Sequence, residues 1–399
     1  MTRPARAILS ASIALAMAAG VLLAPARAGA AAGPSSHRST AAAASQRIDP
    51  GQLQRLLDQI VAAGAPGAAA WIQDEHGVQR AASGVADLRT GRPMRAGLHF
   101  RAASLTKPLV ATVVLQLVAE GRLSLQDTVE GWLPGTLPYG DQVTIRQLLN
   151  HTSGVPDYAA SVYPTLYGSW QGRFRVWTPQ ELVGLVADQP PDFPPGTAWS
   201  YSNTGYVLLG LIVEAATGTT LGQELHRRIL RPLGLRDTFF PVNAPGIPSP
   251  RSHGYSLPLS PQGEPLEGPL LDFTVFNPSP FWATGNLIST LEDLTRFFRA
   301  LLGGRLLPPR LLAAMTTTVP TGRPSLSYGL GLLVRETPAG RLIGHDGDLP
   351  GFLNIVFSTE DGRRQFGLMR NEQFAPPAVE EAFGQAVIAI AMGLLGGAA

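Results

Sequence analysis

The sequence has no cysteine and little charge, and both absences narrow the possible chemistry. Without cysteine among its 399 residues, the chain cannot form disulfides, a thiolate nucleophile or a cysteine-ligated metal site. Charged residues make up 15% of the chain and the formal net charge is +2, so no basic surface for a nucleic-acid partner is expected. The seven histidines show no HExxH-type spacing, and we therefore expect no metal site.

Lysine is almost absent as well. Among 31 lysines and arginines only Lys107 is a lysine, and it follows Ser104 by three residues. A compositional bias toward arginine explains why other lysines are missing, but it does not explain why this one is kept. Ser-x-x-Lys alone is a short pattern that also occurs by chance, so the pair needs support from other motifs.

The stretch after Lys107 is apolar on nearly every side and stops at Gly121, which predicts a buried helix. If Ser104 lies at its start, the hydroxyl and the amine share a helix face. A buried amine with a lowered pKa can take the serine proton, whereas a guanidinium stays charged. Pro108 disfavours helical geometry at the residue before it, so an irregular helix start is expected.

The N-terminus has the pattern of an export signal. Arg3 and Arg6 precede an apolar run over residues 8–24, and Ala26-Arg27-Ala28 offers a cleavage site. We interpret residues 1–28 as a signal peptide, in preference to a membrane anchor, and residues 29–47 as a low-complexity linker. The mature protein is then expected to be secreted.

Hydrophobic periodicity places strands near both chain ends. A helix from Asp49-Pro50 precedes a hairpin of strands at residues 67–73 and 78–85. Later strands are expected at residues 328–336, 341–344, 351–358 and 364–370, helices at 144–150, 179–187, 205–217 and 294–302, and a closing apolar helix at 378–395. This pattern favours one antiparallel sheet built from both ends, with a largely helical insertion between them. The closing helix has Glu380 and Glu381 at its head and is interpreted as a core helix rather than a membrane span.

Two further short motifs stand in order along the chain. Tyr201-Ser202-Asn203 lies on a loop before a helix, and His345-Asp346-Gly347-Asp348 lies on the edge of a late hairpin. Each motif alone is weak, because a Tyr-x-Asn is usually a turn and a single histidine usually makes only a hydrogen bond. With Ser-x-x-Lys in this order, the chain over about residues 48–395 resembles the serine β-lactamase and penicillin-binding protein family. It most resembles the class C β-lactamase and low-molecular-weight D,D-carboxypeptidase branch.

The resemblance implies a role for each motif residue and requires no cofactor. Ser104 would be the acylated nucleophile and Lys107 its base. Tyr201 would pass a proton between Ser104 and the leaving group, and Asn203 would hydrogen-bond the substrate amide. His345 would orient Tyr201.

The same resemblance puts the third motif against the substrate. The backbone N–H groups of Ser104 and Asp348 would form the oxyanion hole, and Asp346, Gly347 and Asp348 would lie along the substrate. Related carboxypeptidases have hydroxyls or small residues where this chain has the two aspartates. Strand alternation would put both carboxylates on one face, where they would repel an anionic C-terminus. The alternative is that both turn to solvent or pair with an arginine such as Arg341.

The implied fold is α/β (α+β), a three-layer α/β/α sandwich with a central antiparallel sheet plus an all-helical domain. We assign residues 48–104 and 285–399 to the sheet domain and residues 105–284 to the helical domain. His151, in the Asn-His-Thr-Ser-Gly segment, is expected to support a loop rather than to act in catalysis.

The function expected first is a secreted serine-type D-Ala-D-Ala carboxypeptidase acting on cell-wall peptides. An esterase, a D-amino-acid peptidase or amidase, and a β-lactamase are alternatives on the same scaffold. A penicillin-binding-like sensor is the non-enzymatic alternative, against which the intact catalytic set argues. The expected partner is a small peptide, ester or β-lactam substrate, with no membrane span left after signal cleavage.

Overall fold

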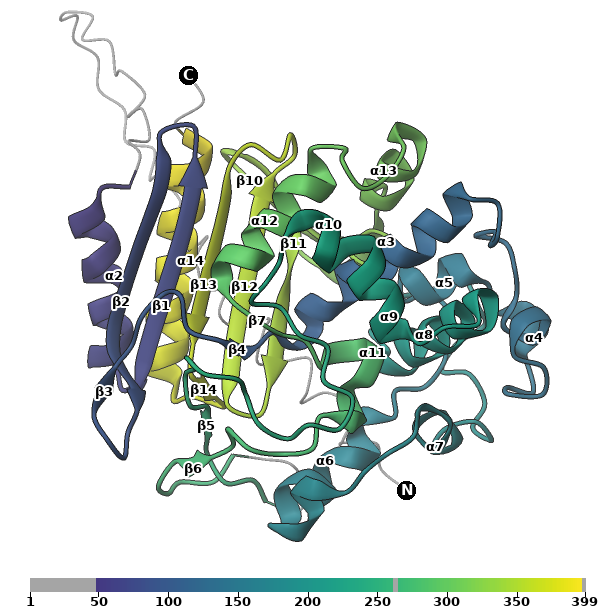
Figure 1. Cartoon of the computed structure of the whole chain (residues 1–399), viewed down its shortest axis with the longest axis horizontal. Coiled ribbons are helices and arrows are strands. Elements are labelled where there is room, and N and C mark those ends of the chain that lie inside the picture. The colour runs from purple at the N-terminus through teal and green to yellow at the C-terminus, as the bar shows by residue number, and fades with distance from the viewer. Residues whose placement is uncertain (1–47, 261–264, 397–399) are drawn as a thin grey trace, which may run out of the picture.

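The computed structural model describes residues 48–260 and 265–396. The expected signal peptide and linker lie outside these residues. Strands from both ends of the chain form one antiparallel sheet, in the order β3-β2-β1-β13-β12-β11-β10-β9-β8 (Figure 1). Its strands are β1 (Gly67–Asp74), β2 (Gly77–Asp87), β3 (Arg92–Pro93), β8 (Val319–Arg323), β9 (Leu326–Tyr328), β10 (Leu333–Thr337), β11 (Gly340–Leu349), β12 (Phe352–Thr359) and β13 (Gln365–Arg370). The strands from the two chain ends meet where β1 pairs with β13, with Ala70 opposite Leu368.

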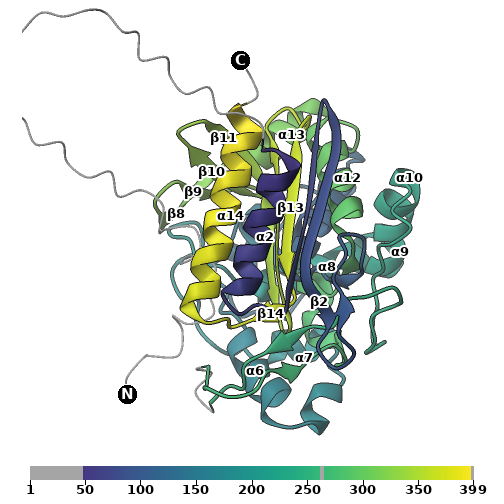
Figure 2. The ribbon, with the colours of Figure 1, turned by 90° about the vertical axis from the view of Figure 1, so that its left-hand side faces the viewer.

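Helices cover both faces of this sheet. The first helix α2 (Pro50–Ala62) and the last helix α14 (Pro377–Gly396) pack together on one face (Figure 2). Helix α12 (Leu291–Leu302) packs on the other face, against β1, β12 and β13. The helical part then adjoins the α12 side, which gives the layered arrangement expected from the sequence (Figure 1).

Local sequence explains where these helices begin. Asp49 caps α2 by accepting a hydrogen bond from the Gln52 backbone N–H. Thr290 caps α12 in the same way, accepting from the Asp293 N–H. By length and composition α14 would pass for a membrane span, but Val379, Phe383 and Ile390 are buried against the sheet and α2.

The remaining elements lie between β3 and β8 in the chain and form the helical part and its loops. They are β4 (Phe100–Arg101), α3 (Thr106–Ala119), α4 (Val129–Trp132), α5 (Ile145–Leu149), α6 (Ala159–Gly168), α7 (Pro179–Gly184), α8 (Asn203–Thr217), α9 (Leu221–Leu225), α10 (Arg231–Leu233), β5 (Tyr255–Ser256), β6 (Leu271–Asp272), α11 (Trp282–Gly285), β7 (Ile288–Ser289) and α13 (Pro309–Thr316). A further short strand, β14 (Glu372–Gln373), pairs in parallel with β5. Helix α3 is buried and packs against α8, α9 and α11, as its all-round apolar sequence predicts.

The single strand expected at residues 328–336 is wrong, because the chain breaks into β9 and β10. Gly329 and Gly331 lie in the break, and no side chain would fit at either. A Cβ on Gly329 would stand 2.1 Å from the Met315 carbonyl oxygen, and one on Gly331 would stand 2.5 Å from the Ala111 Cβ in α3. The chain leaves the sheet here to pass over α3, which no local pattern reveals.

Candidate active site

Ser104 lies on a short 3₁₀ turn (Ala103–Leu105) directly before α3, which confirms the irregular helix start. Ala103 has a φ of +54°, a left-handed conformation that costs energy for a residue with a side chain. The Thr106 hydroxyl fixes this turn by donating to the Ala103 carbonyl at 2.8 Å. The backbone at the serine is therefore held in a strained, defined geometry.

Lys107 lies behind Ser104 and is fully buried. Its Nζ donates to Ser104 Oγ at 3.0 Å, to Asn203 Oδ1 at 2.8 Å and to the Thr284 carbonyl at 2.8 Å. Burial lowers the pKa of Lys107 to about 7, although Asp157 and Asp346 act in the opposite direction. A lysine with this pKa is partly neutral near pH 7 and can accept a proton.

Tyr201 reaches Ser104 from the opposite side. Its hydroxyl donates to Ser104 Oγ at 3.0 Å, and burial raises its pKa well above the ordinary value. The His151 ring packs on Tyr201 with 4.3 Å between ring centroids, and His151 Nδ1 accepts from the Ser202 N–H at 3.2 Å. These contacts match the loop-supporting role expected for His151.

The orienting role expected of His345 toward Tyr201 stays a prediction, and the described contacts between the two residues run through a third. Its side chain is completely buried, and Nε2 is 2.8 Å from the Tyr328 hydroxyl. Tyr328 in turn packs edge-on against Tyr201, with 6.4 Å between ring centroids. His345 is therefore connected to Tyr201 by way of Tyr328, a residue that no motif indicated.

Gly347 permits β11 to lie against the turn that carries Ser104. A Cβ at this position would stand 2.2 Å from the Ala102 carbonyl oxygen and 3.0 Å from the Ala103 Cβ. Pairing of β10 with β11 ends at Gly344, so the rest of β11 is free to run past Ser104. Glycine at position 347 is therefore required so that β11 can lie close to the turn before α3, and it offers no side chain to a substrate.

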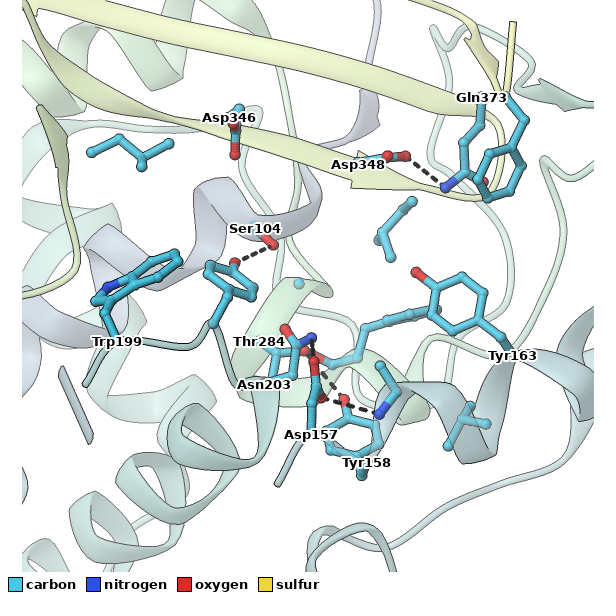
Figure 3. A pocket seen from close by; sticks show the side chains of 18 of the residues that line it. Ser104, Asp157, Tyr158, Tyr163, Trp199, Asn203, Thr284, Asp346, Asp348 and Gln373 are labelled. Carbon is cyan, nitrogen blue, oxygen red and sulfur yellow. Dashed lines mark hydrogen bonds between the residues drawn. The ribbon is translucent and has the colours of Figure 1, made fainter. Parts of the chain in front are cut away.

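Asp346 and Asp348 both line the pocket beside Ser104 (Figure 3). The alternative that both turn to solvent is therefore wrong, and Arg341 pairs instead with Glu336 and Glu360. Burial raises the pKa of Asp348 to about 7, against a hydrogen bond from Gln373 that lowers it. Alternation along β11 decides this placement.

Asp157 was missed by the sequence reasoning. Its Oδ2 accepts from Asn203 Nδ2 at 2.9 Å and its Oδ1 from the Ala159 N–H at 3.1 Å. Because Lys107 donates to the Asn203 oxygen, the amide of Asn203 is fixed between a cation and a carboxylate, and its second N–H remains for a substrate. Asp157 follows Gly154 by three residues, but nothing in that spacing marks it as part of the site.

The pocket has a volume of about 110 Å³ and two different ends. One wall belongs to the core on the α2 and α14 side and includes Trp199, Leu326 and Leu333. The other wall belongs to a separate cluster of buried residues under α6. In Figure 3 Asp346 lies toward Trp199, whereas Asp348 lies toward Tyr163 and Gln373. Within the described residues no group of His, Asp and Glu side chains could hold a metal ion.

A Ser-x-x-Lys turn joined to a Tyr-x-Asn loop under an antiparallel sheet edge defines the β-lactamase and transpeptidase-like class of proteins. The chain belongs to the Beta-lactamase family, whose model matches residues 53–389. This confirms the family and fold class that the motifs indicated.

The curated relatives with similar sequences include both a penicillin-binding protein and an esterase. Penicillin-binding protein 4* of Bacillus subtilis is 29% identical over 298 residues, which cover 73% of this chain and 64% of the relative. Esterase EstB of Burkholderia gladioli is 36% identical over 255 residues, which cover 59% of this chain and 64% of the esterase. The chain thus spans less than two thirds of the length of either relative.

Two solved structures illustrate matches over nearly the whole length of the neighbour. A D-stereospecific amidohydrolase from Streptomyces sp. is 37% identical with a TM-score of 0.76, covering 84% of this chain and 97% of that one. The D-amino acid amidase of Ochrobactrum anthropi SV3, complexed with L-phenylalanine, is 32% identical with a TM-score of 0.74, covering 85% and 98%.

Proposed function

We propose that the protein is a secreted serine hydrolase that cleaves small amides and esters through an acyl-enzyme on Ser104. The observation that carries this proposal is that Ser104 Oγ lies 3.0 Å from both Lys107 Nζ and the Tyr201 hydroxyl. A serine between a lysine of lowered pKa and a neutral phenol has both a proton acceptor and a proton donor at its oxygen.

In the proposed reaction, neutral Lys107 takes the proton of Ser104 while the hydroxyl oxygen attacks the substrate carbonyl. Backbone N–H groups of Ser104 and Asp348 stabilise the oxyanion. Tyr201 gives a proton to the departing amine or alcohol, and the proton that Lys107 took from Ser104 then restores the phenol of Tyr201. Water then attacks the acyl-enzyme by the same route in reverse, which releases the acid and frees Ser104.

The substrates that the pocket favours are amides and esters without a free carboxylate beside the cleaved bond. Asp346 lines the end of this pocket that lies toward Trp199, and one unit charge at about 4 Å from another costs up to ~4 kcal/mol at an effective dielectric near 20. Two of the related structures are named as a D-stereospecific amidohydrolase and a D-amino acid amidase, and both names describe the hydrolysis of amides. We therefore propose hydrolysis of D-amino-acid amides and esters ahead of carboxypeptidase action.

D-Ala-D-Ala carboxypeptidase activity, which the sequence suggested first, is the second candidate. Arg323 also lines the pocket, and a guanidinium there could hold a terminal carboxylate. The sequence similarity to Penicillin-binding protein 4* also supports a carboxypeptidase. Under this alternative, peptides with a free C-terminus would be better substrates than their neutral counterparts.

A single panel of substrates with one acyl group distinguishes these functions. The purified protein would be offered the amide, the methyl ester and the D-Ala conjugate of D-alanine, the L-alanine amide and a cephalosporin, with Ser104→Ala as control. We expect turnover of the D-amide and the ester at least tenfold faster than of the D-Ala-D-Ala peptide. Faster turnover of the peptide would establish the carboxypeptidase, and faster turnover of the cephalosporin a β-lactamase.

Intact-mass spectrometry with penicillin tests the acyl-enzyme separately. We expect a one-to-one adduct in the parent protein and none in Ser104→Ala. Absence of turnover on the whole panel together with absence of any adduct would contradict the proposed hydrolase.

A further inference from the structure

The two ends of the pocket differ in their relation to Tyr201. Tyr201 packs in the same cluster as Trp199, Leu326 and Leu333, which line the Asp346 end. Because Tyr201 is the proton donor to the leaving group in the proposed reaction, the leaving group departs toward that end. The acyl group of the substrate then extends toward the opposite end, where Asp348 lies.

The Asp348 end is lined by bulky apolar side chains. They come from α6, the 3₁₀ turn before α11, the end of β11 and the segment after β14: Ala159, Tyr163, Phe281, Leu349 and Phe374. Several of them form a buried cluster that is separate from the main cores of the protein. This end of the pocket suits an apolar or aromatic side chain on the acyl group.

Asp348 is held at the mouth of this apolar end by a chain of hydrogen bonds. The Tyr167 hydroxyl donates to Gln373 Oε1, and Gln373 Nε2 donates to Asp348 Oδ1 at 2.6 Å. Because Tyr167 occupies the amide oxygen, the NH₂ group of Gln373 faces the carboxylate. Among the described residues nothing donates to Asp348 Oδ2, which leaves that oxygen for a ligand.

The charges around Asp348 favour a cation. Asp346 and Glu380 are the nearby acidic groups and Arg370 is the nearby basic one, but Arg370 is itself paired with Glu380. Asp157 cannot replace Asp348 as an anchor, since both of its oxygens already accept hydrogen bonds from Asn203 and Ala159. Within the part of the chain that the structure describes, the one carboxylate with a free oxygen at the acyl end is therefore Asp348.

We propose that Asp348 binds the α-ammonium group of the substrate's acyl residue, while the apolar end of the pocket takes that residue's side chain. The preferred substrates are then amides and esters of bulky apolar amino acids with an unblocked amino group. This inference rests on the proposed hydrolase function and adds to it which part of the substrate is recognised and by which residues. Tyr167 and Gln373 are positioning residues for Asp348.

The test compares D-phenylalanine amide with 3-phenylpropanamide, which is the same amide without the ammonium group. The ratio of kcat/KM for these two substrates is measured in the parent protein, in Asp348→Asn and in Asp346→Asn as the matched control. Asn keeps the volume, the backbone N–H and the contact with Gln373. We expect the ratio to fall at least 30-fold in Asp348→Asn and to stay within threefold in Asp346→Asn.

A second variant tests the side-chain pocket without touching the carboxylates. Ala159→Leu places three extra carbon atoms into the apolar end and keeps the backbone N–H that binds Asp157. We expect the preference for D-phenylalanine amide over D-alanine amide to fall at least tenfold, mainly through KM. Tyr167→Phe should raise KM for the ammonium substrate more than for 3-phenylpropanamide.

The possible failures are distinguishable. If the parent protein hydrolyses both amides with no preference for the ammonium substrate, or if Asp348→Asn leaves the ratio unchanged, the proposed ammonium site is wrong and the hydrolase stands. If Asp346→Asn lowers the ratio as strongly as Asp348→Asn, the anchor is not specific to Asp348. If no substrate is cleaved and Ser104 is not acylated by penicillin, both proposals fail together.

Discussion

At the scale of single residues, burial decides which group beside Ser104 can act as the base. It lowers the pKa of Lys107 to about 7 and raises that of Tyr201 well above its ordinary value, because a low-dielectric site disfavours the charged form of either group. The amine is therefore partly neutral at working pH, and the phenol keeps its proton. This difference supports Lys107 as proton acceptor and Tyr201 as proton donor.

Lys107→Arg tests that assignment. A guanidinium keeps the positive charge but cannot be deprotonated, so we expect kcat to fall about 10³-fold, or about 4 kcal/mol of barrier. In the parent protein kcat/KM should rise with pH until the amine is neutral, at about pH 7, and then level off. Arg55→Lys on the exposed side of α2 is the control for a change of basic residue. A Lys107→Arg protein that keeps more than a tenth of the activity would contradict the assignment.

At the scale of elements, the site depends on how closely strand β11 approaches the turn that carries Ser104. No side chain fits at Gly347, because its Cβ would meet the Ala102 carbonyl oxygen at 2.2 Å. The contact between this strand and this turn is what puts Asp346 and Asp348 beside the nucleophile. The pocket is therefore a product of two elements more than 200 residues apart in the chain.

Gly347→Ala should separate these two elements. Because the clash is with backbone atoms, the strand must shift by a distance that catalysis tolerates poorly, and we expect kcat/KM to fall at least 100-fold. Gly168→Ala in α6 is the matched control, since nothing lies within 4 Å of a Cβ there. The measurement is kcat/KM together with the free energy of unfolding. Activity within threefold of the parent protein would show that this close approach is not needed.

At the scale of the whole molecule, the two chain ends are joined by a buried polar network as well as by the sheet. Arg370 at the end of β13 pairs with Glu380 of α14 and donates to the backbone carbonyl of Glu372 at 3.3 Å. The Glu372 side chain is 1% exposed and its Oε2 has no hydrogen-bond partner among the described residues. A buried carboxylate in this position should make global stability depend on pH.

Glu372→Gln tests this dependence. Burial raises the pKa of Glu372 from 4.5 to about 7, so the folded protein binds more protons than the unfolded chain between these values. Stability is therefore lost as pH rises through this range, by about 3 kcal/mol for a shift of about 2.5 pKa units. We expect Glu372→Gln to gain about that much relative to the parent protein between pH 4.5 and pH 8, measured by urea unfolding.

The exposed residue Glu381 on the same side of the molecule supplies the control. Glu381→Gln should leave the pH dependence of unfolding unchanged within about 0.5 kcal/mol, as is usual for surface substitutions. Equal behaviour of the two variants would show that Glu372 is not the group responsible.

The sequence by itself determined the local features and the identity of the reacting groups. Asp49 marked the first helix, alternation marked the β1–β2 hairpin, and the all-round apolar stretch after Lys107 marked a buried helix. A single lysine three residues after Ser104, followed by Tyr201 and Asn203, indicated the chemistry. These signals are readable because they depend on neighbours within one or two turns of the chain.

Only the tertiary structure decided which distant groups meet at the site. Asp157 fixes Asn203, Tyr328 stands between His345 and Tyr201, and Gln373 holds Asp348. None of these contacts leaves a periodic or spacing signal. The break between β9 and β10 has the same origin. Gly329 and Gly331 are required there because α13 and α3 pack against their backbone, and those helices are distant in sequence. Burial, which sets the pKa values on which the proposed catalysis depends, is likewise a property of the packed molecule.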